Sequence, residues 1–164
     1  MLLYRAMSRE EYNILIEKGF EATFRKRWKY FTLDPEYIYI IFHEPNYGLC
    51  PKIKYHVAVE FNILFSKPLE WLLRNDVIRV FRERKKYTTI AMKNIAPYHI
   101  EKLEYRVVDP DKLPEPEPVL IWINKHGKIR KVYRRDKALT ILNQIKNPER
   151  ILYISGETLW QWKK

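Results

Sequence analysis

The sequence predicts an α+β protein that consists of a mainly β body with two or three helices and a small basic unit with the element order ββαβ. Three observations favour this class. Several segments alternate apolar and polar residues with period two, as strands with one buried face do. Short segments with helix-capping residues lie among them. The proline-rich segment DPDKLPEPEP at 109–118 then separates the two parts.

The body begins with a predicted strand and a predicted helix. LLYRAM at 2–7 predicts the strand. Ser8 and Glu11 have the spacing of a capping box, in which the serine side chain caps a backbone N–H group and the glutamate side chain reaches back to the cap. The helix should end at Gly19, because glycine readily adopts the left-handed conformation of a helix C-terminus.

The next segments are rich in aromatic residues. Residues 20–31 combine them with lysine and arginine, which predicts a strand or the rim of a loop. Residues 32–42 predict a short buried helix, since Thr32 or Asp34 can cap it and a proline follows at the first helical position. A strand is the alternative for this apolar segment. Residues 43–51 predict a turn-rich loop.

The remaining part of the body is predicted to be mostly sheet. The clearest strand lies at 52–65, where every second residue is apolar. The same alternation predicts further strands, preceded by a short helix. These are the helix at 68–76 and the strands at 77–84, 86–95 and 101–109, the last two joined by the turn APYHI.

The C-terminal part predicts a hairpin, a helix and a strand. VLIWIN at 119–124 and IRKVYR at 129–134 flank the turn KHGK, in which Gly127 can take the positive φ that such turns require. Asp136 can cap a helix with one apolar stripe. ILYIS at 151–155 is the next strand, and GETLWQW is a possible last one.

The proline-rich segment predicts a stiff linker, because its four prolines and four acids can neither pair as a central strand nor continue a helix. We therefore expect a body at 1–108, a linker at 109–118 and a basic unit at 119–164. Since so short a unit seldom buries enough surface to fold alone, it should dock on the body.

Composition indicates a folded protein with an anionic partner. The net charge is +11, and residues 119–164 hold eleven lysines and arginines against three acids. The apolar segments are too short for a membrane span, and the charged N-terminus does not suit a signal peptide, so we expect a cytoplasmic protein. Two glutamines and abundant Lys, Arg, Glu, Ile and Tyr resemble the composition of heat-adapted proteins.

Several kinds of site are disfavoured by what the sequence lacks. Cys50 is the only cysteine, which excludes an internal disulfide and a cysteine-based metal cage. The four histidines lie in separate segments, so no metal site is expected. The chain also lacks the glycine-rich phosphate loop and the GxSxG and HExxH motifs. A bound nucleotide would therefore be held by side chains.

Over residues 2–108 the body resembles the ADP-ribosyltransferase-like superfamily. The resemblance lies in the order of LYRAMS, EEYNILIEKGF, KYFTLDPEY, HVAVEFNI and NIAPYHIEKLEYRV. Members often have a first strand that ends in arginine or histidine, a helix that closes at Gly-Phe, an aromatic-Ser/Thr segment before a helix, and late strands around an Ile-x-Pro-x-x-Ile turn. The resemblance implies an antiparallel split sheet with NAD in the cleft between its halves, and transfer of ADP-ribose from NAD.

The resemblance also implies which residues hold the cofactor. Arg5 matches the first-strand arginine that contacts the dinucleotide, a role suited to its charged, fork-shaped guanidinium. The motif that shapes the nicotinamide pocket falls on Phe31 and Thr32, with Tyr37 shortly after. The plainer alternatives are an ion pair for Arg5, a helix cap for Thr32 and core packing for Tyr37.

The same resemblance implies a glutamate that stabilises an oxocarbenium-like transition state. It is expected about eight to ten residues before Pro97, but that window, YTTIAM, has no acid. Glu83 is the nearest upstream candidate for the catalytic residue, and Glu60 is the reserve. Since Glu83 lies in the basic segment RVFRERKK, a solvated ion pair is its plainer role.

The basic unit favours a different hypothesis, binding of DNA or RNA through residues 119–137. Its candidate phosphate-binding residues are Lys125, Lys128, Arg130, Lys131, Arg134 and Arg135. Alternation along a strand would align Lys128, Arg130 and Arg134, and RERKK at 82–86 would extend the patch. The aromatic residues available for stacking on bases are Trp122, Tyr133, Trp160 and Trp162.

Three functions therefore stay open. The chain is an ADP-ribosyltransferase-like protein with a basic tail, a non-catalytic nucleic-acid-binding protein whose body is a scaffold, or a structural or interaction protein whose charge mainly keeps it soluble. The sequence indicates no oligomeric state.

Overall fold

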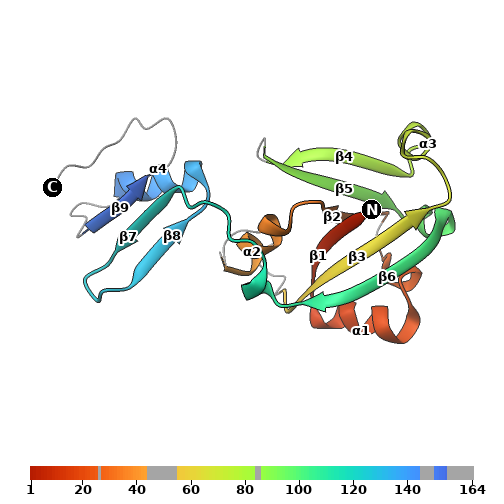
Figure 1. The fold of residues 1–164 in the computed structure, drawn as a ribbon, viewed down its shortest axis with the longest axis horizontal. Coiled ribbons are helices and arrows are strands. Elements are labelled where there is room, and N and C mark those ends of the chain that lie inside the picture. Colours follow the sequence, from red (N-terminus) through yellow and green to blue (C-terminus); the bar gives the residue numbers. More distant parts are fainter. Residues whose placement is uncertain (26, 44–54, 84–85, 145–149, 155–164) are drawn as a thin grey trace. The chain divides into compact units, whose positions relative to one another are not determined.

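The computed structural model describes residues 1–25, 27–43, 55–83, 86–144 and 150–154, with side chains for all of these except 83 and 150–154. The chain divides into two compact units, which are drawn in Figure 1. We call Met1–Pro114 the body and Glu115–Lys164 the C-terminal unit. The division falls within the proline-rich segment. The described residues form nine strands and four α-helices, which confirms the α+β class.

The body contains one six-stranded sheet with the order β4-β5-β2-β1-β3-β6, in which all neighbours are antiparallel. Its strands are β1 (Leu2–Met7), β2 (Trp28–Thr32), β3 (Val57–Phe65), β4 (Ile78–Glu83), β5 (Tyr87–Lys93) and β6 (Ile100–Val108). Pairing is extensive within β4-β5-β2 and within β1-β3-β6, whereas β1 and β2 share the single register pair Tyr4–Thr32. In Figure 1 β4 and β5 lie above β1 and β2, and β3 and β6 lie below them. The sheet thus consists of two halves joined at one point.

Three α-helices and three short 3-10 helices connect the strands of the body. They are α1 (Arg9–Lys18), η1 (Glu21–Thr23), α2 (Pro35–His43), α3 (Leu69–Arg74), η2 (Ala96–His99) and η3 (Pro110–Lys112). Helices α1 and α3 contribute to the larger apolar core on one face of the sheet, and α2 contributes to a smaller core on the other face. No helix in the described part of the chain is long and apolar enough to cross a membrane.

The larger core lies on the face that we call the α1 face. Phe61 of β3 is fully buried there, and its ring lies 5.5 Å from those of Phe20 and Phe31. Leu15 of α1 and Leu72 of α3 are buried in the same core. Because these aromatic rings come from both halves of the sheet, the core holds the halves together where backbone pairing is sparse.

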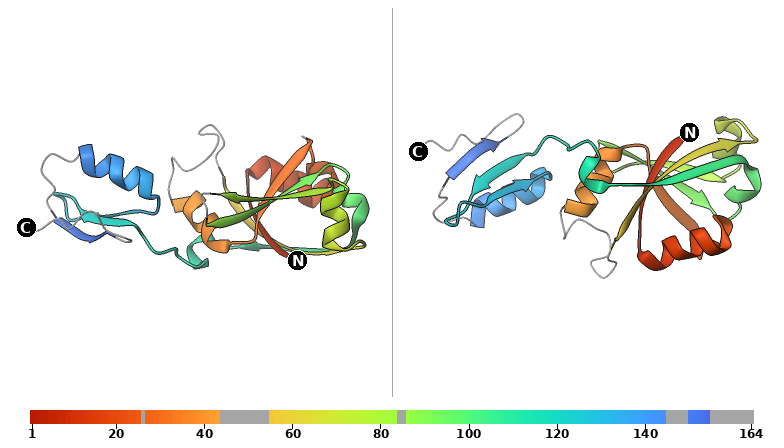
Figure 2. Two further views of the ribbon diagram at one scale, coloured as in Figure 1. Left: turned by 90° about the horizontal axis from the view of Figure 1, so that it is seen from above. Right: turned by 60° about the horizontal axis from the view of Figure 1, so that its bottom comes forward.

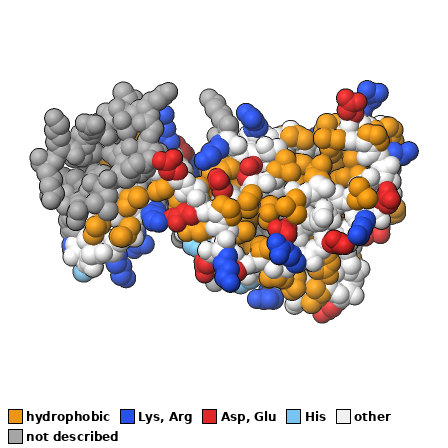
Figure 3. Space-filling view, in the orientation of Figure 1, with side chains coloured by type: hydrophobic (Ala, Val, Ile, Leu, Met, Phe, Trp, Pro, Cys, Tyr) orange, Lys and Arg blue, Asp and Glu red, His pale blue; other side chains and the backbone are white. Residues whose placement is uncertain are grey.

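The opposite face, which we call the α2 face, is only partly covered. Ile38 of α2 packs on Tyr4, Ala6 and Ala58 of β1 and β3. Elsewhere on this surface large side chains such as Tyr30 are exposed. Figure 3 shows hydrophobic side chains that reach the surface of the body among acidic and basic ones.

Most local predictions for the body are confirmed. The predicted helix at 32–42 is α2, not a strand, and the serine half of the capping box is present, since Ser8 Oγ accepts from the Glu11 backbone N–H at 3.1 Å. Gly19 ends α1 with φ +89°. The prediction that the Glu11 side chain completes the capping box is wrong, because the Glu11 carboxylate accepts from Arg5 instead. Most of the predicted loop at 43–51 lies outside the described residues.

The C-terminal unit has the predicted order ββαβ. Its elements are β7 (Leu120–Ile123), β8 (Ile129–Val132), α4 (Arg135–Gln144) and β9 (Arg150–Ile154), with the strands in the order β8-β7-β9. Gly127 has φ +73° in the hairpin turn, as predicted. Helix α4 lies against one face of the sheet, with Ala138 and Leu142 buried (Figure 2). The predicted cap is wrong, because α4 begins at Arg135 and the carboxylate of Asp136 in its first turn pairs with Arg134.

Replacing Phe61 tests the role of the core between the halves. We expect Phe61→Ala to lower the free energy of unfolding by about 3 to 5 kcal/mol, since it leaves a cavity where rings from both halves meet. Urea denaturation measures this. Leu64→Ala, an exposed position on the same strand, is the control and should change stability little. Equal losses in the two variants would contradict the assignment.

Candidate functional site

The point where the halves of the sheet separate is occupied by Arg5. Beyond the pair Tyr4–Thr32, β1 and β2 have no further register pair, so the side chain of Arg5 replaces a backbone partner. Its Nη1 donates to the carbonyl oxygen of Tyr30 on β2 at 2.6 Å. The guanidinium also lies 5.7 Å from the ring centroid of Phe31. Arg5 therefore bridges the two halves on the α1 face.

Arg5 belongs to a group of charges that we call the ionic cluster, formed by Arg5, Glu11 and Lys29. Arg5 donates to both oxygens of Glu11, from Nε at 2.8 Å and from Nη2 at 3.1 Å. Lys29 Nζ lies 2.5 Å from Glu11 Oε1 and also donates to the hydroxyl and the carbonyl oxygen of Thr23. Two cations thus share one carboxylate, and the cluster keeps a net positive charge when all three groups are ionised.

Burial controls the ionisation of the cluster. Only 4% of the Lys29 side chain is exposed. Burial and, to a smaller extent, the nearby Arg5 lower the pKa of Lys29 to about 8, although Glu11 opposes the shift. Burial raises the pKa of Glu11, but Arg5 and Lys29 outweigh it and hold that pKa below its usual value. At neutral pH the cluster is therefore charged, and an additional anion would be attracted to it.

Arg5 retains some binding capacity. A guanidinium has five N–H donors, and Glu11 and Tyr30 accept from three different nitrogens. The Arg5 side chain is 22% exposed, so it is neither fully solvated nor sealed in the core. The remaining donors of Nη1 and Nη2 are the groups that could contact a ligand.

Thr32, at the end of β2, makes two hydrogen bonds within the body. Its hydroxyl donates to the carbonyl oxygen of Thr88 at 3.1 Å and accepts from the backbone N–H of Asp34 at 3.0 Å. Asp34 in turn accepts from the Thr88 backbone N–H at 2.6 Å. These bonds tie the start of α2 to β5. The plainer role predicted for Thr32 was a helix cap, but its hydroxyl accepts from Asp34, which precedes the first residue of α2.

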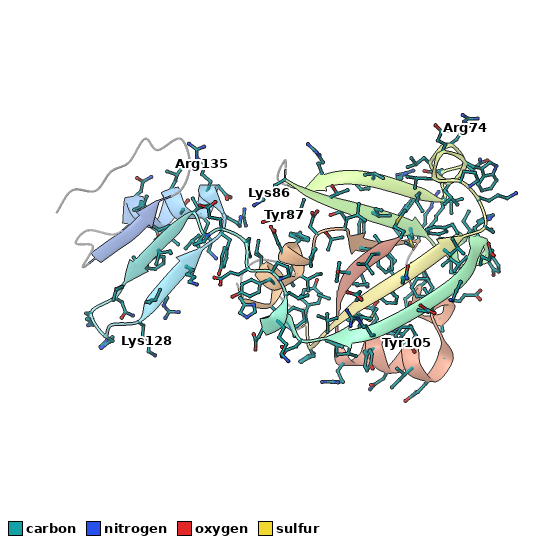
Figure 4. The ribbon with its side chains drawn as sticks, in the orientation of Figure 1. Arg74, Lys86, Tyr87, Tyr105, Lys128 and Arg135 are labelled. Carbon is teal, nitrogen blue, oxygen red and sulfur yellow. The ribbon has the colours of Figure 1, made fainter. Side chains whose placement is uncertain are left out.

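Tyr37 lies beside the window in which the resemblance places a glutamate. Its ring stacks on that of Tyr87, with centroids 5.2 Å apart. Tyr87 begins β5, and the backbone of Glu83 lies opposite it on β4. Figure 4 shows Lys86 and Tyr87 at this end of the two strands. The fold therefore brings Tyr37 and the backbone of Glu83 to Tyr87, while the Glu83 side chain lies outside the described part.

A row of side chains that we call the polar row, polar in all members except Phe81 at its end, crosses the α2 face and was not apparent from the sequence. Successive register pairs align one residue from each strand, namely Phe81, Thr89, Thr32, Tyr4, Glu60 and Arg106. Arg106 Nε donates to Glu60 at 2.7 Å, and this bond lowers the Glu60 pKa. Burial, followed by the hydrogen bond to Glu60, raises the pKa of Tyr4. Among the described residues, the buried hydroxyl of Thr89 has no partner.

The predicted site residues of the body do not gather in one place. Arg5 projects from the α1 face, since it belongs with Glu11 and Phe31. Thr32 aligns with Tyr4 on the α2 face. The sequence offered no way to see this, because the faces depend on the register between distant strands. No group of three metal-ligating side chains occurs in the described ranges.

The predicted basic residues of the C-terminal unit form no continuous stripe. Lys131 pairs with Glu115 at 2.6 Å, and Arg134 pairs with Asp136 at 2.5 Å. Val132, which lies between Arg130 and Arg134 on the predicted stripe, is buried. Figure 4 shows Lys128 at the hairpin turn and Arg135 at the opposite end of the unit.

The cations of this unit that have no acidic partner among the described side chains are Lys125, Lys128, Arg130 and Arg135, and all four are exposed. The Asn124 side chain orders the turn between the strands, since it accepts from the backbone N–H groups of His126 and Lys128. Trp160 and Trp162 lie outside the described residues.

The lowered pKa of Lys29 predicts a pH dependence of stability. Between pH 8 and about 10 we expect the free energy of unfolding to rise in the natural sequence relative to Lys29→Met. In this range the folded lysine loses its proton near 8, while the unfolded one holds it to 10.5, so the unfolded state binds more protons. The slope is at most about 1.4 kcal/mol per pH unit.

Urea denaturation across this pH range measures the effect, with the exposed Lys102→Met as the control. The raised pKa values of Tyr4 and Tyr98 act in the opposite direction above pH 10 and limit the useful range. Parallel pH profiles for the natural sequence and Lys29→Met would contradict the assignment.

Comparison with known proteins finds no matching family model, no matching curated protein and no matching solved structure. The function is therefore argued from the residues of this chain.

Proposed function

We propose that the body binds NAD at the junction of its two half-sheets and that the protein is ADP-ribosyltransferase-like. The observation that carries the proposal is the ionic cluster at this junction. Two cations share one carboxylate there, and Arg5 is oriented by Glu11 and by the Tyr30 carbonyl oxygen. A dinucleotide carries negative charge on its pyrophosphate, which this excess positive charge would attract.

The architecture agrees with the resemblance seen in the sequence. The resemblance implies an antiparallel sheet in two halves, and β4-β5-β2 and β1-β3-β6 meet at one register pair. It also implies an arginine in the first strand, and Arg5 occupies β1 at the junction. Charge-assisted hydrogen bonds from a guanidinium are among the stronger contacts to phosphate oxygens.

Transfer of ADP-ribose would need a carboxylate besides the binding residues. Glu83 is the candidate that the resemblance leaves, and its backbone lies opposite Tyr87, at the start of the β5 window in which the resemblance expects the catalytic acid. Tyr87 belongs to the α2 face with Thr89 and Thr32, whereas Arg5 lies on the α1 face, so the proposal rests on NAD binding and not on a catalytic geometry. Tyr37, stacked on Tyr87, belongs to the same α2 face. Glu60 is engaged by Arg106 and Tyr4, which makes it the less suitable acid.

NAD binding is tested by thermal unfolding with and without the ligand. At tenfold excess over its dissociation constant NAD adds about 1.4 kcal/mol, which raises Tm by about 3 to 6 °C for a chain of this size. We expect Arg5→Lys to abolish most of the shift, since lysine lacks the bidentate fork. The absence of any shift in the natural sequence would refute the proposal.

The matched control is Arg25→Ala, which removes an exposed arginine paired with Glu10 at 3.0 Å. This variant should keep the full NAD shift. Isothermal titration calorimetry on the folded Arg5→Lys protein separates lost binding from lost stability. An unchanged affinity for NAD in that variant would place the dinucleotide elsewhere.

The C-terminal unit supports a second candidate function, electrostatic binding of nucleic acid. The observation that favours it is the set of four exposed cations without an acidic partner among the described residues, Lys125, Lys128, Arg130 and Arg135. Phosphate contacts of this kind make affinity fall steeply as salt is added. The function does not require the body to be catalytic.

Changing all four of these residues to alanine tests this candidate. We expect the slope of log affinity against log salt concentration to become less negative by about 3, because each lost phosphate contact removes about 0.7 to 0.9. Fluorescence anisotropy with labelled oligonucleotides measures it. The matched control changes four exposed lysines of the body, Lys18, Lys67, Lys102 and Lys112. An equal change of slope in both variants would argue against a specific role for the unit.

A further inference from the structure

The half-sheet β4-β5-β2 presents aromatic and basic side chains together on the α2 face. We call this surface the aromatic platform, and its members are Trp28, Tyr30, Arg79, Phe81 and Lys93. The strand register places them on one face, since Trp28 lies opposite Lys93 and Tyr30 and Arg79 both lie opposite Ala91. Phe81 follows Arg79 by two residues along β4. The opposite face of the same half contributes Phe31, Ile78, Ile90 and Met92 to the larger core.

Two of the three aromatic rings of the platform are open to solvent. Tyr30 is 52% exposed and Phe81 is 42% exposed. Helix α2 covers Tyr4, Ala6 and Ala58 of β1 and β3 and reaches this half at Tyr87, where Tyr37 stacks, but Tyr30 and Phe81 stay exposed. Exposed aromatic rings on a sheet face are the arrangement on which unpaired bases stack.

The cations of the platform are held in place. Arg79 Cζ lies 4.3 Å and Lys93 Nζ 5.4 Å from the centroid of the Trp28 ring. Asp76 accepts from Arg79 at 2.7 and 3.1 Å and from Lys93 at 2.9 Å. Two cations again share one carboxylate, so the group has a net positive charge next to the exposed rings.

Charge is divided unequally between the two halves of the body. The segments that contain β2, β4 and β5, residues 24–32 and 71–95, hold eleven lysines and arginines against two acids. Those that contain β1, β3 and β6, residues 1–12, 55–66 and 96–108, hold four against five. The net positive charge of the body therefore belongs to the segments of the half that bears the platform, and it complements a polyanion.

We infer that the aromatic platform binds single-stranded nucleic acid. Bases stack on Tyr30 and Phe81, and Arg79 and Lys93 face the phosphates. A duplex hides the faces of its bases and would lose this stacking, so the single strand is the favoured ligand. The inference does not depend on the proposed NAD site, which lies on the α1 face.

The test uses the full chain and a fluorescein-labelled single strand, as DNA and as RNA, in anisotropy titrations at low salt. We expect the double variant Tyr30→Ala and Phe81→Ala to weaken binding by about tenfold or more, because each stacked base contributes strongly. The control is Tyr105→Ala, since Tyr105 is a 40% exposed tyrosine on β6 of the other half. It should bind as the natural sequence does.

A second double variant shows whether a loss of binding in the first is caused by misfolding. Tyr30→Leu with Phe81→Leu keeps the apolar surface but removes the rings, and we expect the same loss of binding with an unchanged Tm. Affinity within twofold of the natural value in the ring-free variants overturns the inference. So does equal affinity for duplex and single strand, or loss of binding only when the four cations of the C-terminal unit are changed.

Discussion

The hydrogen bond from Arg5 to the carbonyl oxygen of Tyr30 is the contact on which the body depends. The strands β1 and β2 pair at one point and then separate, so backbone groups at the junction lose their ladder partners. Arg5 supplies a donor to one of these groups, the carbonyl oxygen of Tyr30, through a charge-assisted hydrogen bond. Bringing a guanidinium to this position requires a carboxylate, which Glu11 provides, and the carboxylate then also accepts from Lys29. The ionic cluster is therefore a consequence of the divided sheet.

This arrangement couples the first helix to the sheet. Ser8 caps α1 through the backbone N–H of Glu11, while the Glu11 side chain turns to Arg5 and Lys29. The Glu11 carboxylate binds the two cations and not a backbone N–H of α1, because charge-assisted hydrogen bonds are stronger than a bond to one neutral N–H group. Replacing either cation would leave the other paired with Glu11 and would remove the net positive charge of the cluster. The start of α1, the junction of the half-sheets and the proposed NAD contact thus share the same few atoms.

The two faces of the sheet have different chemistry. The α1 face carries the core and the ionic cluster, where binding capacity is limited to the remaining donors of Arg5. The α2 face carries the polar row and the aromatic platform, where side chains such as Tyr30 reach solvent. A ligand with a compact anionic group suits the first surface, and an extended polyanion with stacking bases suits the second. The proposed NAD site and the proposed nucleic-acid surface therefore lie on different faces of the sheet.

The sequence by itself determined the local elements, because their signals lie within a few residues. The alternation of apolar and polar residues predicted the strand β3. Ser8 and Gly19 predicted the two ends of α1, and Gly127 predicted the hairpin turn of the C-terminal unit. Local rules were wrong for the side chains of Glu11 and Asp136, which found charged partners in place of backbone caps. Only the tertiary structure determined which residues come together at the proposed site. Arg5 donates to a carbonyl oxygen 25 residues away, and the polar row takes one residue from each of six strands. Register between distant strands sets these contacts, and no short segment of the chain encodes it.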